Sequence, residues 1–127
     1  MFGEIDPRSP TPIWEQIASR VRVAVAAGDL LPGEALPSVR ELARRLRVNP
    51  ATVAQAYKEL AKEGFVMSRH GAGTFVQEVN AQRKAQERRV RAGELVRRLF
   101  QDGARLGITT SELAAAFKTE VGRQGNE

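Results

Sequence analysis

The segment from Ser38 to Lys58 concentrates side chains that can bind phosphate. Four arginines and one lysine stand against the single acidic residue Glu41, which leaves a net charge of +4 (five minus one). Cationic side chains neutralise nucleic-acid phosphates and release their condensed counterions. A single arginine on a short helix is most often a solvated residue, but this concentration indicates a polyanionic partner. The basic residues are Arg40, Arg44, Arg45, Arg47 and Lys58.

Two helix starts lie close together in the same stretch. Ser38, followed three residues later by Glu41, predicts a capping box in which each side chain bonds the other residue's backbone amide. Asn49-Pro50 predicts the start of a second helix. Asn is a preferred N-cap, and Pro is tolerated at the first helical position because the backbone N–H that it lacks would have no partner there. Two starts this close require a sharp bend, so the stretch predicts a helix-turn-helix.

The apolar spacing gives each of the two helices one buried face. The expected core residues are Val39, Leu42, Ala43 and Leu46 on the first helix and Val53, Ala56, Tyr57 and Leu60 on the second. This leaves the following residues of the second helix pointing away from the core: Ala51, Thr52, Gln55, Lys58 and Lys62. The N-terminal end of a recognition helix meets base edges in the major groove.

The N-terminal residues predict one more helix in front of the pair. Phe2 to Pro10 is expected to form an extended arm, and Thr11-Pro12 to cap a helix that runs to about Ala27. Its apolar residues recur at helical spacing, so it is expected to bury one face. Gly28 ends it, and a very short extended piece is expected at Ala35-Leu36.

A glycine-rich hairpin is expected after Gly64. Two short strands, Phe65–Ser68 and Thr74–Val76, flank a loop that carries Arg69 and His70 at its tip. Gly71 and Gly73 give this loop the freedom either to turn or to approach a phosphate closely. Three helices followed by such a hairpin make a winged helix, so the fold class is expected to be mainly α with a small β-hairpin.

Composition excludes several other classes of protein. The chain has no cysteine and one histidine among its 127 residues, so neither a disulfide nor a metal site is expected. No apolar run approaches the roughly 18 residues of a membrane span and no secretory leader is evident, so no membrane association and a cytoplasmic location are expected. We find no paired carboxylates, activated nucleophile or cofactor fingerprint, and therefore expect neither an enzyme nor a cofactor. The net charge of +5 favours a polyanionic partner.

These motifs resemble the N-terminal domain of the GntR family of bacterial transcriptional regulators. The resemblance covers residues 1–78 and rests on the Gly-x-Leu-x-Pro-Gly turn, Leu-Pro-Ser-x-Arg-Glu-Leu, Val-Asn-Pro-x-Thr-Val and Gly-x-Gly-Thr-Phe-Val. It implies a winged helix in which Arg40, residues 49–52 and the wing at 69–71 contact an operator. Ala51 departs from relatives that often carry a polar side chain there, and its methyl group suits thymine. The residues predicted to contact DNA are Ser38, Arg40, Arg44, Asn49, Ala51, Thr52, Gln55, Lys58, Arg69, His70 and Gly71.

Residues 79–127 resemble the short two-helix tail of the YtrA-type subfamily. A long helix is expected from Ala81 to about Gln101, and Thr109 with Glu112 predicts a capping box for a second helix. Two such helices cannot close a core alone, which favours a dimer. The tail carries +4 of the net charge, which either adds phosphate contacts or keeps the helix in solution. The residues predicted to form the dimer interface are Leu95, Val96, Leu99, Phe100, Leu113, Phe117 and Val121.

The sequence therefore predicts a winged helix-turn-helix over 1–78 and a helical dimerisation or effector tail over 79–127. The predicted function is that of a homodimeric repressor of transcription, which binds a near-palindromic site in double-stranded DNA. The alternative is a winged-helix module that docks other proteins, because a fold does not fix its function. The operator, the regulated genes and the existence of a small-molecule effector stay open at this stage.

Overall fold

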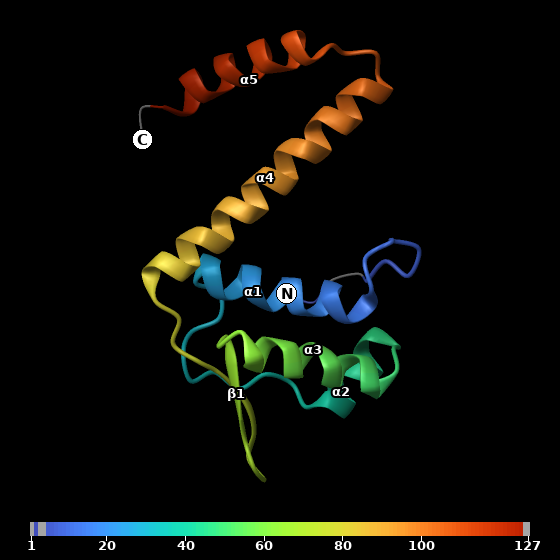
Figure 1. Ribbon diagram of the computed structural model, residues 1–127, viewed down its shortest axis with the longest axis vertical. Helices are drawn as coiled ribbons and strands as arrows, with labels where there is room; N and C mark the ends of the chain where they lie inside the picture. Colours follow the sequence, from blue (N-terminus) through green and yellow to red (C-terminus); the bar gives the residue numbers. More distant parts are fainter. Residues whose placement is uncertain (1, 3–4, 126–127) are drawn as a thin grey trace. The chain divides into compact units, whose positions relative to one another are not determined.

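Five helices and one hairpin make up the computed structural model, which describes residues 2 and 5–125 (Figure 1). The elements are α1 (Ile13–Ala27), α2 (Val39–Leu46), α3 (Pro50–Lys62), β1 (Val66–Arg69), β2 (Gly73–Val76), α4 (Ala81–Arg105) and α5 (Thr110–Gln124). The chain forms two compact units, here called the reader unit (up to Arg88) and the tail unit (from Arg89). This element order confirms the winged helix-turn-helix with a two-helix tail.

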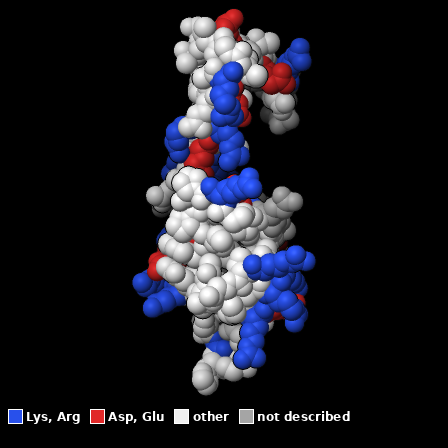
Figure 2. Space-filling model, turned by 90° about the vertical axis from the view of Figure 1, so that its right-hand side faces the viewer, with Lys and Arg blue, Asp and Glu red and all other residues white. Residues whose placement is uncertain are grey.

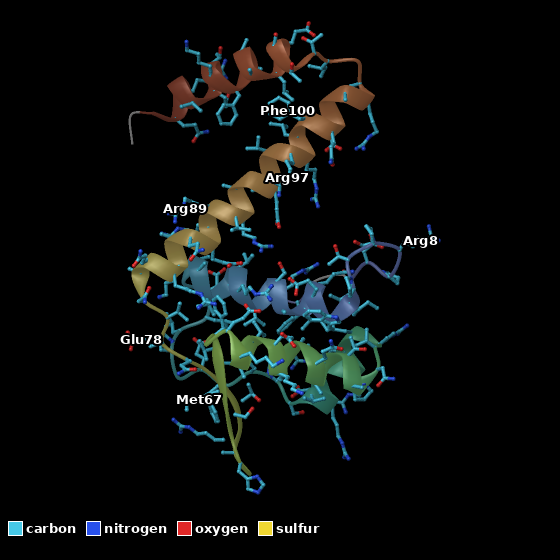
Figure 3. All side chains as sticks on the ribbon, viewed as in Figure 1. Arg8, Met67, Glu78, Arg89, Arg97 and Phe100 are labelled. Carbon is cyan, nitrogen blue, oxygen red and sulfur yellow. The ribbon has the colours of Figure 1, made fainter. Side chains whose placement is uncertain are left out.

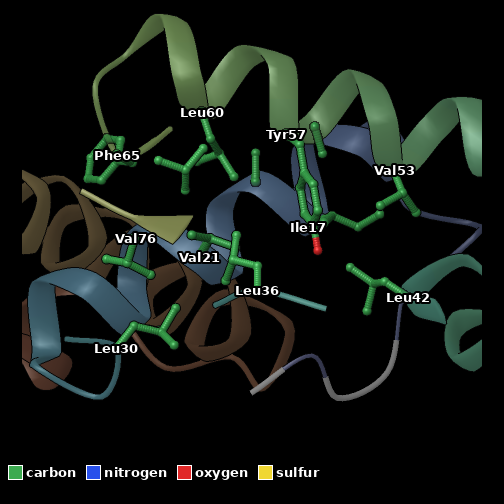
Figure 4. Close-up of a cluster of buried hydrophobic side chains, with 14 of the residues drawn as sticks. Ile17, Val21, Leu30, Leu36, Leu42, Val53, Tyr57, Leu60, Phe65 and Val76 are labelled. Atoms are coloured by element: carbon green, nitrogen blue, oxygen red, sulfur yellow. The ribbon is translucent and has the colours of Figure 1, made fainter. Parts of the chain in front are cut away.

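The core of the reader unit lies where α1 packs against α3 (Figure 4). Ile17 and Val21 of α1 and Val53 and Leu60 of α3 are fully buried, as the helical spacing predicts. Phe65, three residues after the end of α3, is buried with them. The chain turns out of the helix at Gly64, whose φ of 86° is the left-handed conformation that glycine adopts without strain. Phe65 N then donates to Leu60 O at 2.9 Å, which closes the end of α3.

The start of α1 differs from the prediction. No side chain caps the helix, and Thr11 is not its N-cap; that position falls on Pro12. Gln16 holds the preceding segment instead, because its Nε2 donates to Asp6 O at 2.8 Å and to Thr11 O at 2.9 Å. The predicted extended arm is also wrong, since Asp6 to Ser9 forms a turn in which Arg8 N donates to Asp6 Oδ1. Gly3 and Glu4 of that arm lie outside the described residues.

The wing is a β-hairpin with a third extended segment beside it. β1 and β2 are antiparallel, with Val66 opposite Val76 and Arg69 opposite Gly73. Ala35 forms a bridge with Phe75 on the other edge of β2, and Leu36 N donates to Thr74 O at 2.9 Å. The short extended piece predicted at residues 35–36 is therefore confirmed, and its role is to pair with the wing. Each strand spans four residues: β1 is shifted by one residue at both ends relative to the prediction, and β2 starts one residue earlier than predicted.

The two tail helices meet at a glycine. α4 continues four residues beyond its predicted end at Gln101, through Gly103, the one buried residue of that helix. A methyl group on Gly103 would lie 3.1 Å from Leu113 Cδ2, so the missing side chain makes room for α5. A glycine inside a helix costs about 1 kcal/mol, which is why the sequence pattern suggested an earlier end. The predicted capping box of Thr109 and Glu112 is present in full.

Candidate nucleic-acid interface

Two caps fix the helix pair that carries most of the predicted contacts. Ser38 Oγ accepts a hydrogen bond from Glu41 N at 3.1 Å at the start of α2, and Asn49 Oδ1 accepts one from Ala51 N at 2.9 Å at the start of α3. The predicted Ser38 capping box is only half formed. Glu41 Oε1 accepts from Arg45 Nη2 at 2.6 Å, so this carboxylate is directed along the helix surface rather than back to its first residue.

The turn between the helices depends on a residue that sequence reasoning did not single out. Arg47 ends α2 with a φ of 57°, and no other residue except glycines adopts a positive φ in the described part of the chain. Val48 N then donates to Ala43 O at 3.0 Å, the same closing bond that a glycine-ended helix makes. The side chain of Arg47 is exposed, so its basic charge is presented at the turn.

Tyr57 joins the two helices from inside. Its ring is buried, and its hydroxyl donates to Pro37 O at 2.8 Å, one residue before the Ser38 cap. Burial raises the pKa of the Tyr57 phenol above its ordinary value, so the group stays protonated and remains a donor. The sequence placed Tyr57 on the core face of α3 but gave no sign of this bond, because the two partners are 20 residues apart.

We expect Tyr57→Phe to lower the free energy of unfolding by about 1 kcal/mol, because the ring still packs while Pro37 O loses its buried donor. Urea denaturation monitored by circular dichroism measures this change. Affinity for duplex DNA, measured in the same buffer, should fall as well, because the bond links α3 to the residue before the Ser38 cap of α2. An unchanged midpoint would show that the Tyr57 hydroxyl does not support the turn.

Some basic side chains at this surface are paired within the protein and others are not. We call a side chain uncommitted when it has no ion-pair or hydrogen-bond partner in the described residues. Arg45 is paired with Glu41. Within residues 5–125, Arg40, Arg44 and Lys58 have no ion-pair or hydrogen-bond partner for their exposed side chains. Figure 2 shows Lys and Arg gathered along the margins of one face of the reader unit around an uncharged centre. Uncommitted cations of this kind can neutralise phosphates without first breaking an internal pair.

The wing carries an arginine that stacks on an aromatic ring and a turn that contains glycine. The hairpin that carries Met67 projects from the reader unit (Figure 3). The guanidinium of Arg69 lies over the ring of Phe75, 5.1 Å from its centroid, which limits the motion of a side chain close to the tip. His70 and Gly71 are exposed beyond it. Gly71 has a φ of 78° in a turn closed by Ala72 N donating to Arg69 O, so its turn-forming role is a structural requirement.

A buried ion cluster fixes the far end of α3. Arg22 of α1 is 8% exposed, and its Nε and Nη2 donate to the two carboxylate oxygens of Glu63 at 2.7 and 2.8 Å. Its Nη1 donates to Glu15 Oε1 at 2.8 Å. The hydrogen bonds that Arg22 donates to Glu63 and Glu15 outweigh desolvation and hold the pKa of Arg22 above its ordinary value. The sequence did not identify this cluster, because Arg22 and Glu63 lie 41 residues apart.

The first turns of α4 belong to the reader unit and contact α1 and the segment after α3. The Arg83 guanidinium lies over the ring of Phe65, 4.9 Å from its centroid, and Arg88 Nη1 donates to Ala26 O at 3.1 Å. Asn80 Oδ1 accepts from Arg83 N at 2.8 Å at the start of the helix. These contacts engage two of the tail's basic residues with the protein itself. They leave other tail arginines exposed, including Arg89.

The structure brings the predicted DNA-contacting residues to two places on the reader unit. The helix pair carries eight of them and the wing carries three, and all are exposed except Thr52, which is half-buried. Sequence reasoning missed Ala54, which is exposed on α3 three residues after Ala51. Its spacing of three residues from Ala51 could have indicated that it lies on the same outward face of the helix. Alanine, however, occurs as readily in a core as on a surface.

The described part of the chain lacks two other kinds of feature. It contains no group of three or more His, Cys, Asp or Glu side chains that could hold a metal ion. It also contains no helix with the length and apolar character needed to cross a membrane.

Known proteins resemble this chain in sequence and in fold. The family model described as bacterial regulatory proteins, gntR family, matches residues 13–76. The HTH-type transcriptional repressor YtrA of Bacillus subtilis (strain 168) is 38% identical over 110 residues, covering 87% of this chain and 85% of that protein. A GntR family transcriptional regulator from Listeria monocytogenes is 31% identical, with a TM-score of 0.66 and coverage of 90% and 97%. AraR(DBD) in complex with operator ORX1 is 29% identical, with a TM-score of 0.51 and coverage of 56% and 88%.

Proposed function

Because the chain belongs to the gntR family of bacterial regulatory proteins, we propose that it is a homodimeric, sequence-specific DNA-binding repressor of transcription. The observation that carries the proposal is the uncommitted polar and basic surface of α2 and α3. Asn49 caps α3, and the outward side chains that follow have no role in the core. Arg40 lies in the first turn of α2, two residues after the Ser38 cap, where a guanidinium can reach either a phosphate or a guanine edge.

The wing supports the same function. Arg69 is held over Phe75 close to the tip, where Gly71 and Ala72 are exposed, so a cation and an accessible backbone are presented together. In a winged helix this loop lies beside the DNA backbone or enters the minor groove. Phosphate contacts from the wing would fix the orientation of the reader unit, while α3 reads base edges.

Homodimerisation is proposed from the tail unit. Residues 89–127 amount to 39 residues, close to the size below which chains usually need a disulfide, a metal or a partner. Phe117 is 54% exposed and Leu95 is 66% exposed, and no residue of α5 is buried. A second copy of the tail would cover these faces: Leu95, Val96, Leu99 and Phe100 on α4, with Leu113, Phe117 and Val121 on α5.

A two-fold dimer would present two α3 helices to one duplex. Their half-sites would lie about one helical turn, roughly 10 bp, or a multiple of that apart, so the operator is expected to be a near-palindrome. DNA reading is assigned to residues 1–78 and dimerisation to residues 79–127, with the first turns of α4 connecting the two. A protein that occupies bacterial promoters acts in the cytoplasm. The identity of an effector, if one acts, stays open.

Selection from a random duplex library with the full chain tests the function directly. We expect recovery of a two-fold symmetric motif that outcompetes random duplex by about 10³-fold or more at physiological salt. Failure to enrich any motif, together with no salt-dependent affinity for duplex DNA, would overturn the proposal. That result would support the alternative function, a winged-helix surface for docking another protein.

We expect Arg40→Ala to weaken operator binding and to reduce the slope of log affinity against log salt by about 0.9, the share of one phosphate contact. Titrations at several salt concentrations by fluorescence anisotropy measure both quantities. Arg123→Ala provides a matched control, because Arg123 is an exposed basic residue near the end of α5. An unchanged slope with reduced sequence discrimination would instead assign Arg40 to a guanine edge. An unchanged affinity and discrimination would remove it from the interface.

A further inference from the structure

The outward face of α3 has an unusual composition for a helix that reads bases. Ala51, Ala54, Gln55 and Lys58 are all exposed, and their spacing of three and four residues places them in one row along the helix. Two of the four side chains end at a single methyl group. We call the first three residues, Ala51, Ala54 and Gln55, the reading row.

The neighbouring polar residues are less free to read bases. Asn49 Oδ1 accepts the capping bond from Ala51 N, which uses one of its two lone pairs and directs the amide toward the helix rather than toward an adenine edge. Thr52 is half-buried. Gln55, by contrast, has no hydrogen-bond partner among residues 5–125, so both ends of its amide are available.

The cations of α3 lie outside the reading row. The helix contains no arginine, and Lys62 in its last turn pairs with Glu59 at 3.5 Å. Lys58 is exposed one turn beyond the reading row. Arginine or lysine bonding to O6 and N7 is the commonest specific contact to guanine, so the N-terminal half of α3 lacks the usual means of selecting that base.

We propose that the reading row selects A·T base pairs. Gln55 bonds N6 and N7 of one adenine, and the methyl groups of Ala51 and Ala54 contact the C5-methyl groups of neighbouring thymines. Each element follows from the chemistry of the major groove, where a glutamine amide matches adenine and an alanine matches only the thymine methyl group. The inference rests on the proposed function and adds the identity of the bases under α3.

Base analogues in the selected operator test this assignment. Replacing the contacted adenine by 7-deazaadenine removes N7 and keeps base pairing, so affinity should fall by at least about fivefold, the lower bound for a good bidentate contact. Replacing a contacted thymine by deoxyuridine removes one methyl group, and affinity should fall about fourfold. Fluorescence anisotropy with the full chain at fixed salt measures both changes.

Variants in α3 assign each effect to a side chain. Gln55→Ala should bind the adenine and 7-deazaadenine duplexes equally. At the one thymine that Ala54 contacts, Ala54→Gly should bind the thymine duplex and the deoxyuridine duplex with equal affinity. Ala61→Gly, which makes the same change at an exposed residue in the last turn of α3, should keep the full thymine preference. This control accounts for the loss of helix stability that glycine causes.

The possible outcomes separate the two proposals. An enriched motif in which the analogues have no effect, or in which the pairs under α3 are G·C, would overturn the reading-row assignment and leave the regulator function intact. If the analogue effects persist in Gln55→Ala and Ala54→Gly, the A·T preference belongs to other residues. That result would also overturn the reading-row assignment. Failure to enrich any motif would overturn the proposed function and this inference together.

Discussion

Replacing Leu99 by glutamate should convert the protein to a monomer and lower its affinity for a two-half-site operator by about 10²- to 10⁴-fold. The change places a charge on the exposed apolar face of α4, where a second tail would have to bury it. Two linked reader units bind the second half-site with the advantage of a high effective concentration, and a monomer loses that advantage entirely. Sedimentation equilibrium measures the mass, and anisotropy titration measures the affinity.

Leu31→Glu is the matched control for this prediction. Leu31 is also an exposed leucine, but it lies in the loop after α1, within the reader unit. The control should remain a dimer and keep its operator affinity. In addition, Leu99→Glu should bind a duplex with one half-site about as well as the unchanged protein does. A dimeric Leu99→Glu variant, or an unchanged protein that is monomeric at micromolar concentration, would contradict the proposed tail interface.

Replacing Arg22 by methionine should lower the free energy of unfolding by about 2 to 4 kcal/mol. The side chain is of similar length and keeps much of the packing, but Glu15 and Glu63 are left facing each other without a cation. Breaking a fully buried pair costs about 3 to 5 kcal/mol, and the partial exposure of both carboxylates reduces that figure. Urea denaturation of the full chain measures the loss.

Lys62→Met tests whether burial of the ion cluster is the cause of the stability loss expected for Arg22→Met. Lys62 pairs with Glu59 near the same end of α3, but its side chain is mostly exposed, so its replacement should change stability by less than about 1 kcal/mol. Adding Glu63→Gln to Arg22→Met should recover part of the loss, because one of the two unpaired charges is removed. Equal effects of Arg22→Met and Lys62→Met would show that the cluster contributes no more than a surface ion pair.

Features set by neighbouring residues could be predicted from the sequence. The caps at Asn49 and Thr109 are formed as expected, because the donor and acceptor are two or three residues apart. The strand pairing of the wing also followed from its local glycine pattern. The apolar period of α1 and α3 identified the faces that form the core, since helical geometry alone determines which residues share a face.

Features that depend on distant residues could not be predicted. The partners of Arg22 and Tyr57 are set by how α1, α2 and α3 pack, which no local pattern encodes. The end of α4 was misplaced for the same reason, because Gly103 is favoured there by contact with Leu113 of the next helix. Ala54 was missed because its small side chain fits a core and a surface equally well.

The extended segment beside the wing has a consequence for how the protein engages its target. Leu36 is hydrogen-bonded to β2, and Ser38 begins α2 only two residues later, so one short stretch of backbone joins the wing to the arginine-bearing helix. In the proposed complex, the wing and the helix that carries Arg40 would meet a duplex in an arrangement already set by folding, so the entropy of ordering them would be lost during folding rather than at each encounter.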